Sequence, residues 1–574
     1  MNTKKPLVIC TTLLIENSPQ ALPLGAACIA SAIKNDARTK DKFSVELRTL
    51  SREESGYPEK QPEEFIAAKI TGNDAPDYVC FSVYVWNRNE LEETAALLKK
   101  RFPSLITIAG GPEVTASPQS FKNFDWCVAG EGECAVPDLL FFLEKQKAGR
   151  TEEMTPVQGV FRTNENSSSK EKNDFVPRAL PPELEKLSSP YLDGTLDPSA
   201  YEGALWELAR GCPFKCSYCY ESKGEKTVRY IPMERIEKEL ELFNKKKLRQ
   251  IFVLDPTYNA DKKRALQLLR LIGQKAPGMF FYFEARAEFI DRELARAFTQ
   301  IPCAIQIGLQ SADPEILRYV HRSLDKKKFV KNINLLNEEG AVFGFDLIYG
   351  LPKDTLEGFK KSLDFALGLY PNNVETFCLS VLPGTALYET AASLGAVFSR
   401  IPPYNVIKTD AFSEKDLQKA KELSTACTIF YNDGRAVPWF NAVCRYFHTR
   451  PSQFLADFYR WYKERVLGNG AECRVHTAIE KMQIEFIYEK LTGRKDSAIS
   501  KPVIKSLILF NGALSRVESD GTEQTAELSF HPNDLISPYA ADILFFAQNA
   551  KRFPCKVRCF KSKTGQIDWK IIHR

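Results

Sequence analysis

Three cysteines, Cys212, Cys216 and Cys219, stand in the sequence RGCPFKCSYC, and their types and spacing predict chemistry more clearly than any other group in the chain. Three thiolates on a short loop can each bind one iron of a 4Fe-4S cluster, which leaves the fourth iron open to a small molecule. Structural zinc is one alternative, but it needs four ligands, and no Cys or His lies between Cys219 and Cys303. A chance group of core cysteines is the other. The spacing and the position directly after an expected strand (205–211) favour the cluster.

The histidine and cysteine counts limit the chemistry further. The chain has five histidines and the first 320 residues contain none, so any chemistry there must work without imidazole. It has 15 cysteines, an odd number, and at 574 residues it is far too large to need disulfides for stability. We therefore expect most cysteines outside this loop to be reduced thiols in the core.

Composition excludes several classes of protein. The length suggests three or four domains at ~150 residues each. The 44% hydrophobic and 26% charged residues are typical of a globular protein and exclude a disordered chain, a collagen and a coiled coil. A net charge of +5 is too small to indicate a nucleic-acid or membrane partner. The apolar stretch 6–15 lacks a cleavage site, and no run reaches the ~18 residues of a membrane span, so we expect a cytoplasmic protein.

Residues 1–148 alternate strand and helix patterns, which predicts a doubly wound, Rossmann-like α/β domain with a parallel sheet. Ligands bind such sheets at the carboxyl ends of the strands. Three of those ends carry the candidate binding residues, some of them glycines that permit close backbone approach to a ligand. The candidates are Ser82, Tyr84, Trp86, Gly110, Gly111, Pro112, Glu113, Gly130, Glu131, Gly132 and Glu133.

The rest of the chain divides into three further segments. Residues 149–204 read as a linker, rich in Pro, Ser and Asp in its second half. Residues 205–400 contain six strand–helix units, which fit a partial (β/α)6 TIM barrel better than a closed eight-fold one. Residues 401–574 form a mixed accessory region, helical and aromatic at first and then with strand patterns at SLILF, AELSF and KVRCF. We expect this region to cover the barrel mouth and shape the substrate pocket.

The CxxxCxxC motif after the first strand of a six-unit barrel resembles the radical S-adenosylmethionine (SAM) superfamily. In the N-terminal domain, LPLGAACIAS, GGPEVTASP and VAGEGE resemble the cobalamin-binding domain of its cobalamin-dependent branch. The resemblance covers residues 1 to about 400. It implies three cofactors, namely a 4Fe-4S cluster on Cys212, Cys216 and Cys219, SAM and cobalamin. It also implies that one electron from the cluster cleaves SAM and releases a 5′-deoxyadenosyl radical.

The same resemblance assigns barrel residues to SAM. Tyr218 falls where the backbone meets the adenine, and Asp255 where the second strand approaches the methionine amino group, although the glycines common there are absent. Further positions match those that hold the methionine, ribose or adenine, namely Glu284, Arg286, Gln310, Ser311, Leu382 and Pro383. Two structural alternatives stay open: Glu284 and Arg286 forming an ion pair, and Gln310 and Ser311 satisfying buried backbone.

The N-terminal domain departs from many cobalamin proteins, which bind cobalt from below through a histidine in a DxHxxG motif. This domain has no histidine, so bound cobalamin would have no protein imidazole ligand. Tyr84 and Trp86 would pack against the corrin ring or belong to the core. A domain that has kept the fold and lost the cofactor is the alternative.

These features predict a cobalamin-dependent radical SAM enzyme. The resemblance favours methyl transfer to an unactivated carbon, or a phosphinate phosphorus, of a small molecule or peptide. An electron donor such as flavodoxin or ferredoxin would reduce the cluster. One alternative is ring formation or rearrangement with cobalamin as electron carrier, and another is a non-catalytic corrinoid-binding or cluster-binding sensor.

Overall fold

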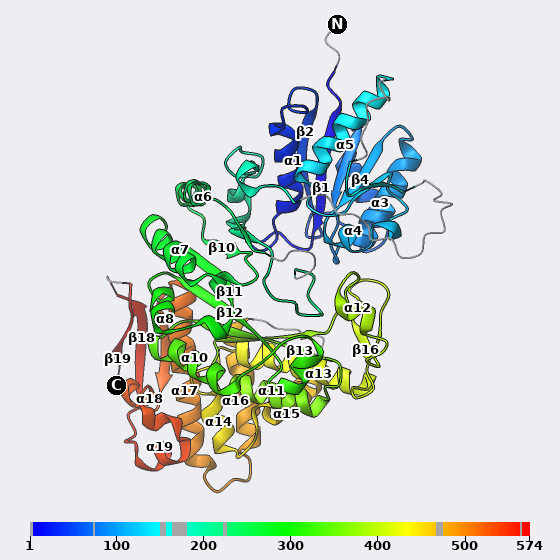
Figure 1. Ribbon diagram of the computed structural model, residues 1–574. Coiled ribbons are helices and arrows are strands. Elements are labelled where there is room, and N and C mark those ends of the chain that lie inside the picture. The colour runs from blue at the N-terminus through cyan, green and yellow to red at the C-terminus, as the bar shows by residue number, and fades with distance from the viewer. Residues whose placement is uncertain are drawn as a thin grey trace.

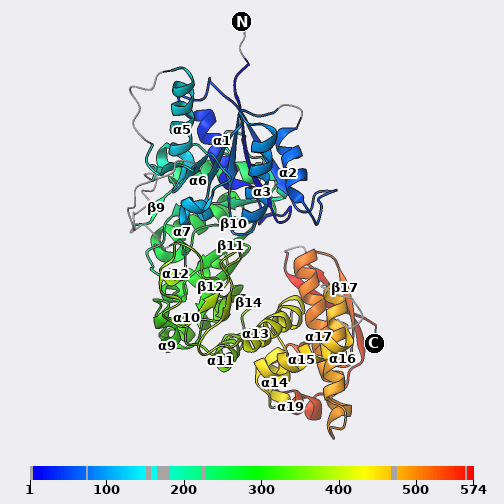
Figure 2. The same ribbon diagram turned by 90° about the vertical axis from the view of Figure 1, so that its right-hand side faces the viewer.

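A computed structural model describes residues 4–72, 75–149, 157–163, 181–221, 227–466, 475–562 and 565–573. The N-terminal part, blue in Figure 1, is an α/β unit built on one sheet, and the green segment builds a second sheet. The last part, yellow to red, is a mostly helical lobe beside the second sheet, at the end of the molecule opposite the N-terminal unit (Figures 1 and 2).

The first sheet has the strand order β2-β1-β3-β4-β5-β6 in the described residues, and only the pair β5-β6 is antiparallel. Its strands are β1 (Leu7–Leu14), β2 (Ser44–Ser51), β3 (Tyr78–Ser82), β4 (Ile106–Gly110), β5 (Trp126–Val128) and β6 (Val160–Arg162). Helices α1 (Leu24–Asn35) and α5 (Gly132–Lys147) pack on one face, and α2 (Pro62–Thr71) and α3 (Arg88–Arg101) on the other. This arrangement confirms the predicted doubly wound fold.

Strand β1 shows how the sequence produces this sheet. All eight residues of LVICTTLL are buried, because helices cover both faces, and such strands read as continuous apolar runs. Strand β3 ends at Ser82, so Tyr84 and Trp86 lie in the following loop. Strand β6 comes from the segment expected to be linker, of which residues 150–156 and 164–180 lie outside the described part.

The second sheet has the order β14-β13-β12-β11-β10-β7, with every pair parallel. Its strands are β7 (Gly203–Trp206), β10 (Gln250–Val253), β11 (Phe280–Ala285), β12 (Cys303–Gln310), β13 (Phe343–Tyr349) and β14 (Asn373–Cys378). In the described chain the two outer strands, β7 and β14, do not pair with each other. The six-stranded partial barrel is therefore confirmed.

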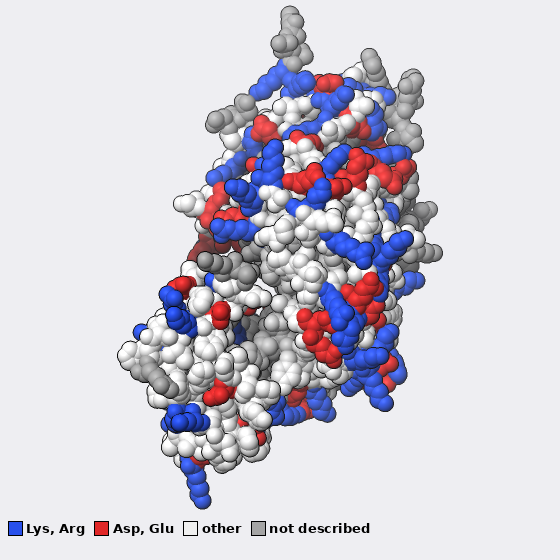
Figure 3. Space-filling view, turned by 90° about the vertical axis from the view of Figure 1, so that its left-hand side faces the viewer, with Lys and Arg blue, Asp and Glu red and all other residues white. Residues whose placement is uncertain are grey.

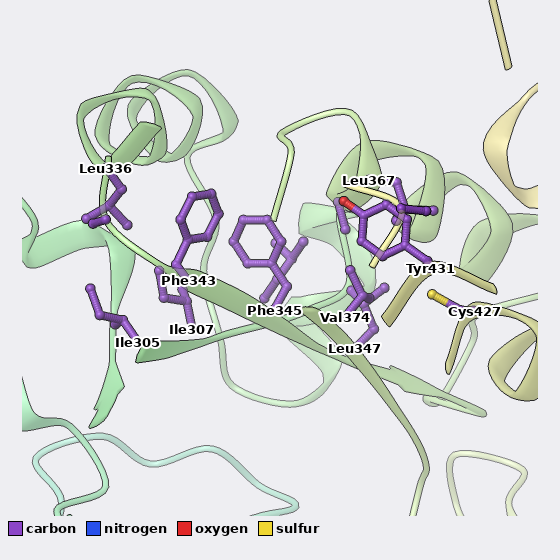
Figure 4. Packing of buried hydrophobic residues seen from close by; sticks show 14 of the residues in the cluster. Ile305, Ile307, Leu336, Phe343, Phe345, Leu347, Leu367, Val374, Cys427 and Tyr431 are labelled. Atoms are coloured by element: carbon purple, nitrogen blue, oxygen red, sulfur yellow. The ribbon is translucent and has the colours of Figure 1, made fainter. Parts of the chain in front are cut away.

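The helices of this second unit cover the outer face of its sheet. They are α6 (Met233–Lys245), α7 (Lys262–Lys275), α8 (Arg292–Phe298), α10 (Lys326–Glu339) and α11 (Leu356–Leu367). Alternate strand residues are buried against them, such as Phe281 and Phe283 of β11, whereas the residues between are half-buried or, at Glu284, exposed. Figure 4 shows Phe343 and Phe345 of β13 in this outer layer. The intervening residues, Glu284 among them, face the barrel interior.

The segment LWELARG, expected to be one strand, is divided. β7 ends at Trp206, and Ala209–Arg210 forms a separate strand, β8, which pairs antiparallel with β9 (Arg229–Tyr230). The cysteine loop lies between β8 and β9. It therefore begins and ends at a short hairpin stem rather than directly at a barrel strand.

The C-terminal lobe packs on the free edge of the barrel sheet. It contains the helices α13 (Glu414–Ala426), α14 (Phe440–Tyr446), α15 (Pro451–Arg465), α16 (His476–Lys490), α17 (Ser497–Asp520) and α19 (Ile543–Asn549) and the antiparallel strands β17 (Gln524–Leu528), β18 (Cys555–Lys561) and β19 (Ile567–His573). The amide of Asn432 accepts from the backbone N–H of Val374 in β14 and donates to its carbonyl, each at 3.0 Å. The lobe thus supplies hydrogen-bond partners to the backbone of an edge strand, which would otherwise be open to pairing with another chain.

One strand prediction for this lobe is wrong. The segment SLILF, residues 506–510, lies inside α17. A short apolar run fits a strand or a buried helix equally well, and here apolar residues at 503, 504, 507, 508 and 510 follow a helical face. The aromatic stretches of the lobe are core, since Phe430 contacts Phe454, Phe458 and Phe486 at 4.7–6.1 Å between ring centroids.

On the face that Figure 3 shows, Lys and Arg are interspersed with Asp and Glu, so this face carries no large patch of one charge. Among the described residues, no helix is both long enough and apolar enough to cross a bilayer.

Candidate cofactor sites

The cysteine loop is held from two sides by backbone hydrogen bonds. The N–H of Ser217 donates to the carbonyl of Val320 at 3.1 Å, and the carbonyl of Ser217 accepts from the N–H of Leu387 at 2.7 Å. Val320 follows α9 (Pro314–Tyr319) and Leu387 lies in α12 (Ala386–Thr390). Two later segments of the barrel therefore fix the middle of the loop, between Cys216 and Cys219.

Asp255 fixes the beginning of the same loop. Its Oδ1 accepts from the N–H groups of Leu208 and Ala209, each at 2.9 Å, and the side chain is buried. Burial raises the pKa of Asp255 to about 7, against the lowering effect of these two hydrogen bonds. The family resemblance implies that Asp255 lies near the methionine amino group of SAM. The structure instead uses its carboxylate to hold the backbone that leads into the cysteines.

In the part of the chain that the structure describes, no three Cys, His, Asp or Glu side chains converge closely enough to hold one metal ion. A 4Fe-4S cluster does not require such convergence, because its thiolates bind separate irons. The donor set fits the cluster: three cysteines lie on one anchored loop. A cation also faces the loop, since Nη1 of Arg322 lies 4.0 Å from Sγ of Cys216 and 3.2 Å from the hydroxyl of Tyr218.

Carboxylates line the barrel interior next to this loop. Glu284 of β11 stands opposite Gln306 of β12, and the Gln306 amide donates to Oδ1 of Asp346 in β13 at 2.7 Å. Burial, and then the charges of Asp346 and Glu221, raise the pKa of Glu284 to about 7. Burial raises the pKa of Asp346 to about 6. Carboxylates in such a place suit a cationic group, such as the amino group of SAM.

Gln310 carries the clearest sign of an absent ligand in the barrel. Its Oε1 is buried and has no hydrogen-bond partner among the described residues, and buried polar atoms are rarely left unpaired. Its Nε2 lies over Gly308, where a Cβ would come within 2.6 Å of it. By contrast, the hydroxyl of Ser311 lies 3.3 Å from that of Ser362 in α11 and also accepts from the N–H of Asp313. Ser311 therefore serves the fold, whereas Gln310 is free to meet a ligand.

Arg286 does not pair with Glu284, which was one of the structural alternatives. It donates to Glu288 at 2.7 Å, and its guanidinium lies 3.8 Å from the ring centroid of Phe214 in the cysteine loop. Arg286 therefore contacts the cysteine loop through a cation–π interaction with Phe214.

Leu382 and Pro383, expected to flank adenine, are half-buried and lead into Gly384. A Cβ on Gly384 would lie 3.2 Å from both Ala116 and Tyr220, and its φ of +78° also favours glycine. Ala116 ends α4 (Pro112–Ala116) in the N-terminal unit, and Tyr220 follows the last cluster cysteine. At Gly384 the last barrel segment thus meets the cysteine loop and the N-terminal unit together.

A cavity of about 750 Å³ lies at the carboxyl ends of the first sheet, between it and the barrel. Of the predicted binding residues it is lined by Ser82, Tyr84, Trp86, Gly110, Gly111, Gly130, Gly132 and Glu133. The barrel contributes Leu205, Glu207, Arg210, Glu221 and Leu254. Its N-terminal side includes apolar residues such as Ile29, Ile108 and Val128. The cavity is therefore shared between the two sheets, with an apolar side and a charged rim beside the cysteine loop.

The residues of this cavity fit a large planar ligand. The rings of Tyr84 and Trp86 stack at 4.5 Å with only 4° between their planes, which gives a flat aromatic surface. Gly25 makes room for Tyr84, since a Cβ there would lie 2.4 Å from the Tyr84 hydroxyl. Gly111, at φ +104°, lies so close to Val83 that a Cβ would come within 2.6 Å of its carbonyl oxygen. Only glycine lets the backbone line the cavity at these points.

Three predicted binding residues do not line the cavity: Pro112, Glu113 and Glu131. Pro112 begins α4, and Glu113 is buried, where it accepts from the hydroxyl of Tyr404 at 2.6 Å and pairs with Arg88 at 3.2 Å. Glu131 pairs with Arg210 at 2.5 Å and also with Arg229. Both glutamates are therefore used to join the N-terminal unit to the barrel half of the chain.

Sequence reasoning missed Arg322, Arg210 and Tyr404, which all make contacts across 77 or more residues of sequence. A buried cation beside a thiolate loop was to be expected on electrostatic grounds. Its position depends on how α9 and the following turn pack on the loop, and no local pattern reveals that.

The comparisons with known proteins agree with this geometry. Residues 206–366 match the Radical SAM superfamily, residues 12–140 match the B12 binding domain, and residues 392–510 match a family described as a protein of unknown function (DUF4080). The chain thus carries a B12-binding domain followed by a radical SAM domain.

Individual relatives are distant. The chain is 24% identical over 485 residues to the cobalamin-dependent radical SAM methyltransferase TokK of Streptomyces tokunonensis, covering 72% of this chain and 68% of that one. It is 26% identical over 358 residues to a 2-(S-pantetheinyl)-carbapenam-3-carboxylate methyltransferase of Streptantibioticus cattleyicolor, covering 55% and 50%. The solved structure of OxsB, a cobalamin-dependent SAM radical enzyme with aqua-cobalamin and SAM bound, shares the fold at a TM-score of 0.56 and 16% identity, covering 85% and 80%.

Proposed function

We propose that this protein is a cobalamin-dependent radical SAM methyltransferase that acts on an unactivated carbon, or a phosphinate phosphorus, of a small molecule or peptide. The observation that carries the proposal is the shared cavity, whose walls come from the B12-binding domain on one side and from the stem of the cysteine loop on the other. Two of the relatives are named methyltransferases, and one of these is described as cobalamin-dependent and radical SAM.

The residues divide the binding tasks among themselves. Cys212, Cys216 and Cys219 would hold the cluster, with Arg322 balancing the negative charge of the loop. The carboxylates of the barrel interior, with Gln310, would hold SAM. When bound, SAM and the cluster supply a carbon-centred radical, and cobalamin supplies a methyl carrier. The protein's own work is to position these groups and to exclude water between the two sheets.

The cluster needs one electron per radical. We propose that a small electron-transfer protein, such as flavodoxin or ferredoxin, supplies it in the cytoplasm, where the chain's thiols stay reduced. A substrate of the small-molecule or peptide class, rather than a nucleic acid, fits the same proposal.

The main rival keeps both cofactors but forms a ring or rearranges the substrate. Counting products per turnover separates the two. Methyl transfer predicts one methylated product with both 5′-deoxyadenosine and S-adenosylhomocysteine formed from SAM, whereas ring formation predicts no methyl gain and no S-adenosylhomocysteine. A non-catalytic sensor would bind both cofactors and form no 5′-deoxyadenosine under strong reductant.

A further inference from the structure

The loop that carries the three cysteines leaves and rejoins the fold at two arginines. Arg210 in β8 and Arg229 in β9 stand directly opposite each other in the antiparallel register. Like charges at opposed positions repel, so the pair requires compensating anions. The compensation comes from the N-terminal unit. Glu131 accepts from both arginines, and Glu133 accepts from Arg210 at 2.7 Å.

The compensating glutamates belong to the cobalamin side of the molecule. Glu131 and Glu133 flank Gly132 at the first turn of α5, directly after the carboxyl end of β5. Glu133 and Arg210 both line the shared cavity. A ligand that fills the cavity therefore touches two members of this ion cluster, which we define as Arg210, Arg229, Glu131 and Glu133.

The ion cluster is largely shielded from water. The side chains of Arg210 and Glu133 are 15% and 10% exposed, so their attraction is screened less than that of a surface pair. Burial acts to raise the pKa of Glu133, but the charge and hydrogen bonds of Arg210 outweigh it and hold that pKa below its usual value. Arg210 also donates through Nε to Glu207, so its guanidinium is held in a fixed orientation.

We propose that this ion cluster couples cobalamin binding to the order of the cysteine loop, so that each cofactor strengthens the binding of the other. Arg210 and Arg229 are positioning residues: they hold the stem of the loop against the turn of Glu131 and Glu133, part of which lines the shared cavity. Coupling between two ligands is reciprocal, so the same factor must appear whichever cofactor is added first. The inference requires both cofactors to bind but is independent of which reaction follows.

A second bridge between the same two units provides a matched control. Glu113 lies at another turn of the first sheet, is buried, and bonds to Arg88 and Tyr404. None of these three residues lines the cavity, and Tyr404 lies outside the cysteine loop. Removing the charge of Glu113 weakens the contact between the two units and leaves the stem of the cysteine loop unchanged.

The experiment compares cobalamin affinity in two forms of the full-length protein, one reconstituted with iron and sulfide and one iron-free. Titration with hydroxocobalamin, followed by absorbance, gives a dissociation constant for each form, and their ratio measures the coupling. In the wild type we expect the iron-loaded form to bind about 5- to 150-fold more tightly. In the double variant Glu131→Gln and Glu133→Gln the ratio falls to about 1, whereas in Glu113→Gln it keeps the wild-type value.

The reciprocal readout is the rate at which a chelator removes iron, which cobalamin should slow in the wild type but not in the double variant. Arg229→Met removes one arginine and leaves the ion pairs of Arg210, so we expect a ratio of cobalamin dissociation constants between the wild-type value and 1. This variant replaces the double variant in the test if the double variant does not fold. A wild-type ratio of 1, or a double variant that keeps the wild-type ratio, would overturn the proposal. Both readouts are made without SAM or substrate, so failure of methyl transfer leaves them intact.

Discussion

Arg322 donates to the hydroxyl of Tyr218 at 3.2 Å and places the same guanidinium nitrogen 4.0 Å from the sulfur of Cys216. Its other terminal nitrogen donates to the carbonyl of Gly308 on the inner face of the barrel, at 2.7 Å. One cation therefore connects the cysteine loop with the wall on which we place SAM.

Removing that cation should impair SAM cleavage strongly. We expect Arg322→Gln to lower the rate of 5′-deoxyadenosine formation by about 100-fold or more, the usual effect of losing a preorganised donor in an active site. Arg322→Lys should recover only part of the rate, because an ammonium lacks the planar fork that reaches Tyr218 and Gly308 together. The control is Arg318→Gln, an exposed residue paired with Glu315, which should keep the wild-type rate. An Arg322→Gln protein as active as this control would contradict the assignment.

The two hydrogen bonds to Asp255 predict a stability effect. Asp255→Ala leaves two buried N–H groups without an acceptor, at a cost of about 1–3 kcal/mol each, and should lower the thermal midpoint. Asp255→Asn keeps an oxygen acceptor in the same place and should be much milder. Equal midpoints for the Ala and Asn variants would show that these bonds do not hold the loop.

The raised pKa of Asp255 also predicts a pH dependence. The folded protein keeps a proton on Asp255 up to about pH 7, whereas the unfolded chain releases it near pH 4. The folded state therefore binds more protons between these values, and this contribution to the free energy of unfolding is lost as pH rises through 7. Asp255→Asn cannot titrate, so thermal scans should show it gaining on the wild type between pH 4 and 7.

SAM affinity should depend on the charge of Glu284. Its pKa is about 7 in the empty barrel, and a bound amino cation favours the carboxylate, so binding releases a proton below pH 7. The dissociation constant of SAM should then fall as pH rises toward 7, by about tenfold per unit at most, and level off above. Glu284→Gln should bind weakly with little of this pH dependence. The measurement is a SAM titration of iron-loaded protein from pH 5.5 to 8.5, and a wild-type constant that does not change with pH would contradict it.

A side chain at Gly384 should destabilise the protein. Gly384→Ala introduces a Cβ at 3.2 Å from Ala116 and Tyr220 and keeps a φ of +78°, which costs about 1–2 kcal/mol by itself. The matched control is Gly340→Ala, where φ is +77° and nothing lies within 4 Å of the added Cβ. The difference between the two thermal midpoints measures the contact alone, and Gly384→Ala should be the less stable. Equal midpoints would mean that this contact between the domains carries no energy.

The sequence predicted the two sheets well because their signals are local. The six strands of the barrel alternate with helices, and the CxxxCxxC spacing is a pattern of eight residues. The sequence predicted less about the site, because several of the candidate binding residues form contacts between the N-terminal unit and the rest of the chain. Glu113 meets Tyr404 across 291 residues, and Glu133 meets Arg210 across 77. A glutamate after a glycine turn looks the same whether it faces a ligand or another domain, and only the packing of the two units decides between them.

The assignment of the cysteine loop as the origin of the radical is tested most directly by Cys216→Ala. Full-length wild type, reconstituted anaerobically with iron, sulfide and cobalamin and given SAM and a strong reductant, should form 5′-deoxyadenosine. The variant, treated in the same way, should form none while still binding cobalamin, although more weakly than the iron-loaded wild type, because the B12-binding domain keeps most of its cavity intact. A Cys216→Ala protein that still releases 5′-deoxyadenosine at the wild-type rate would contradict the account.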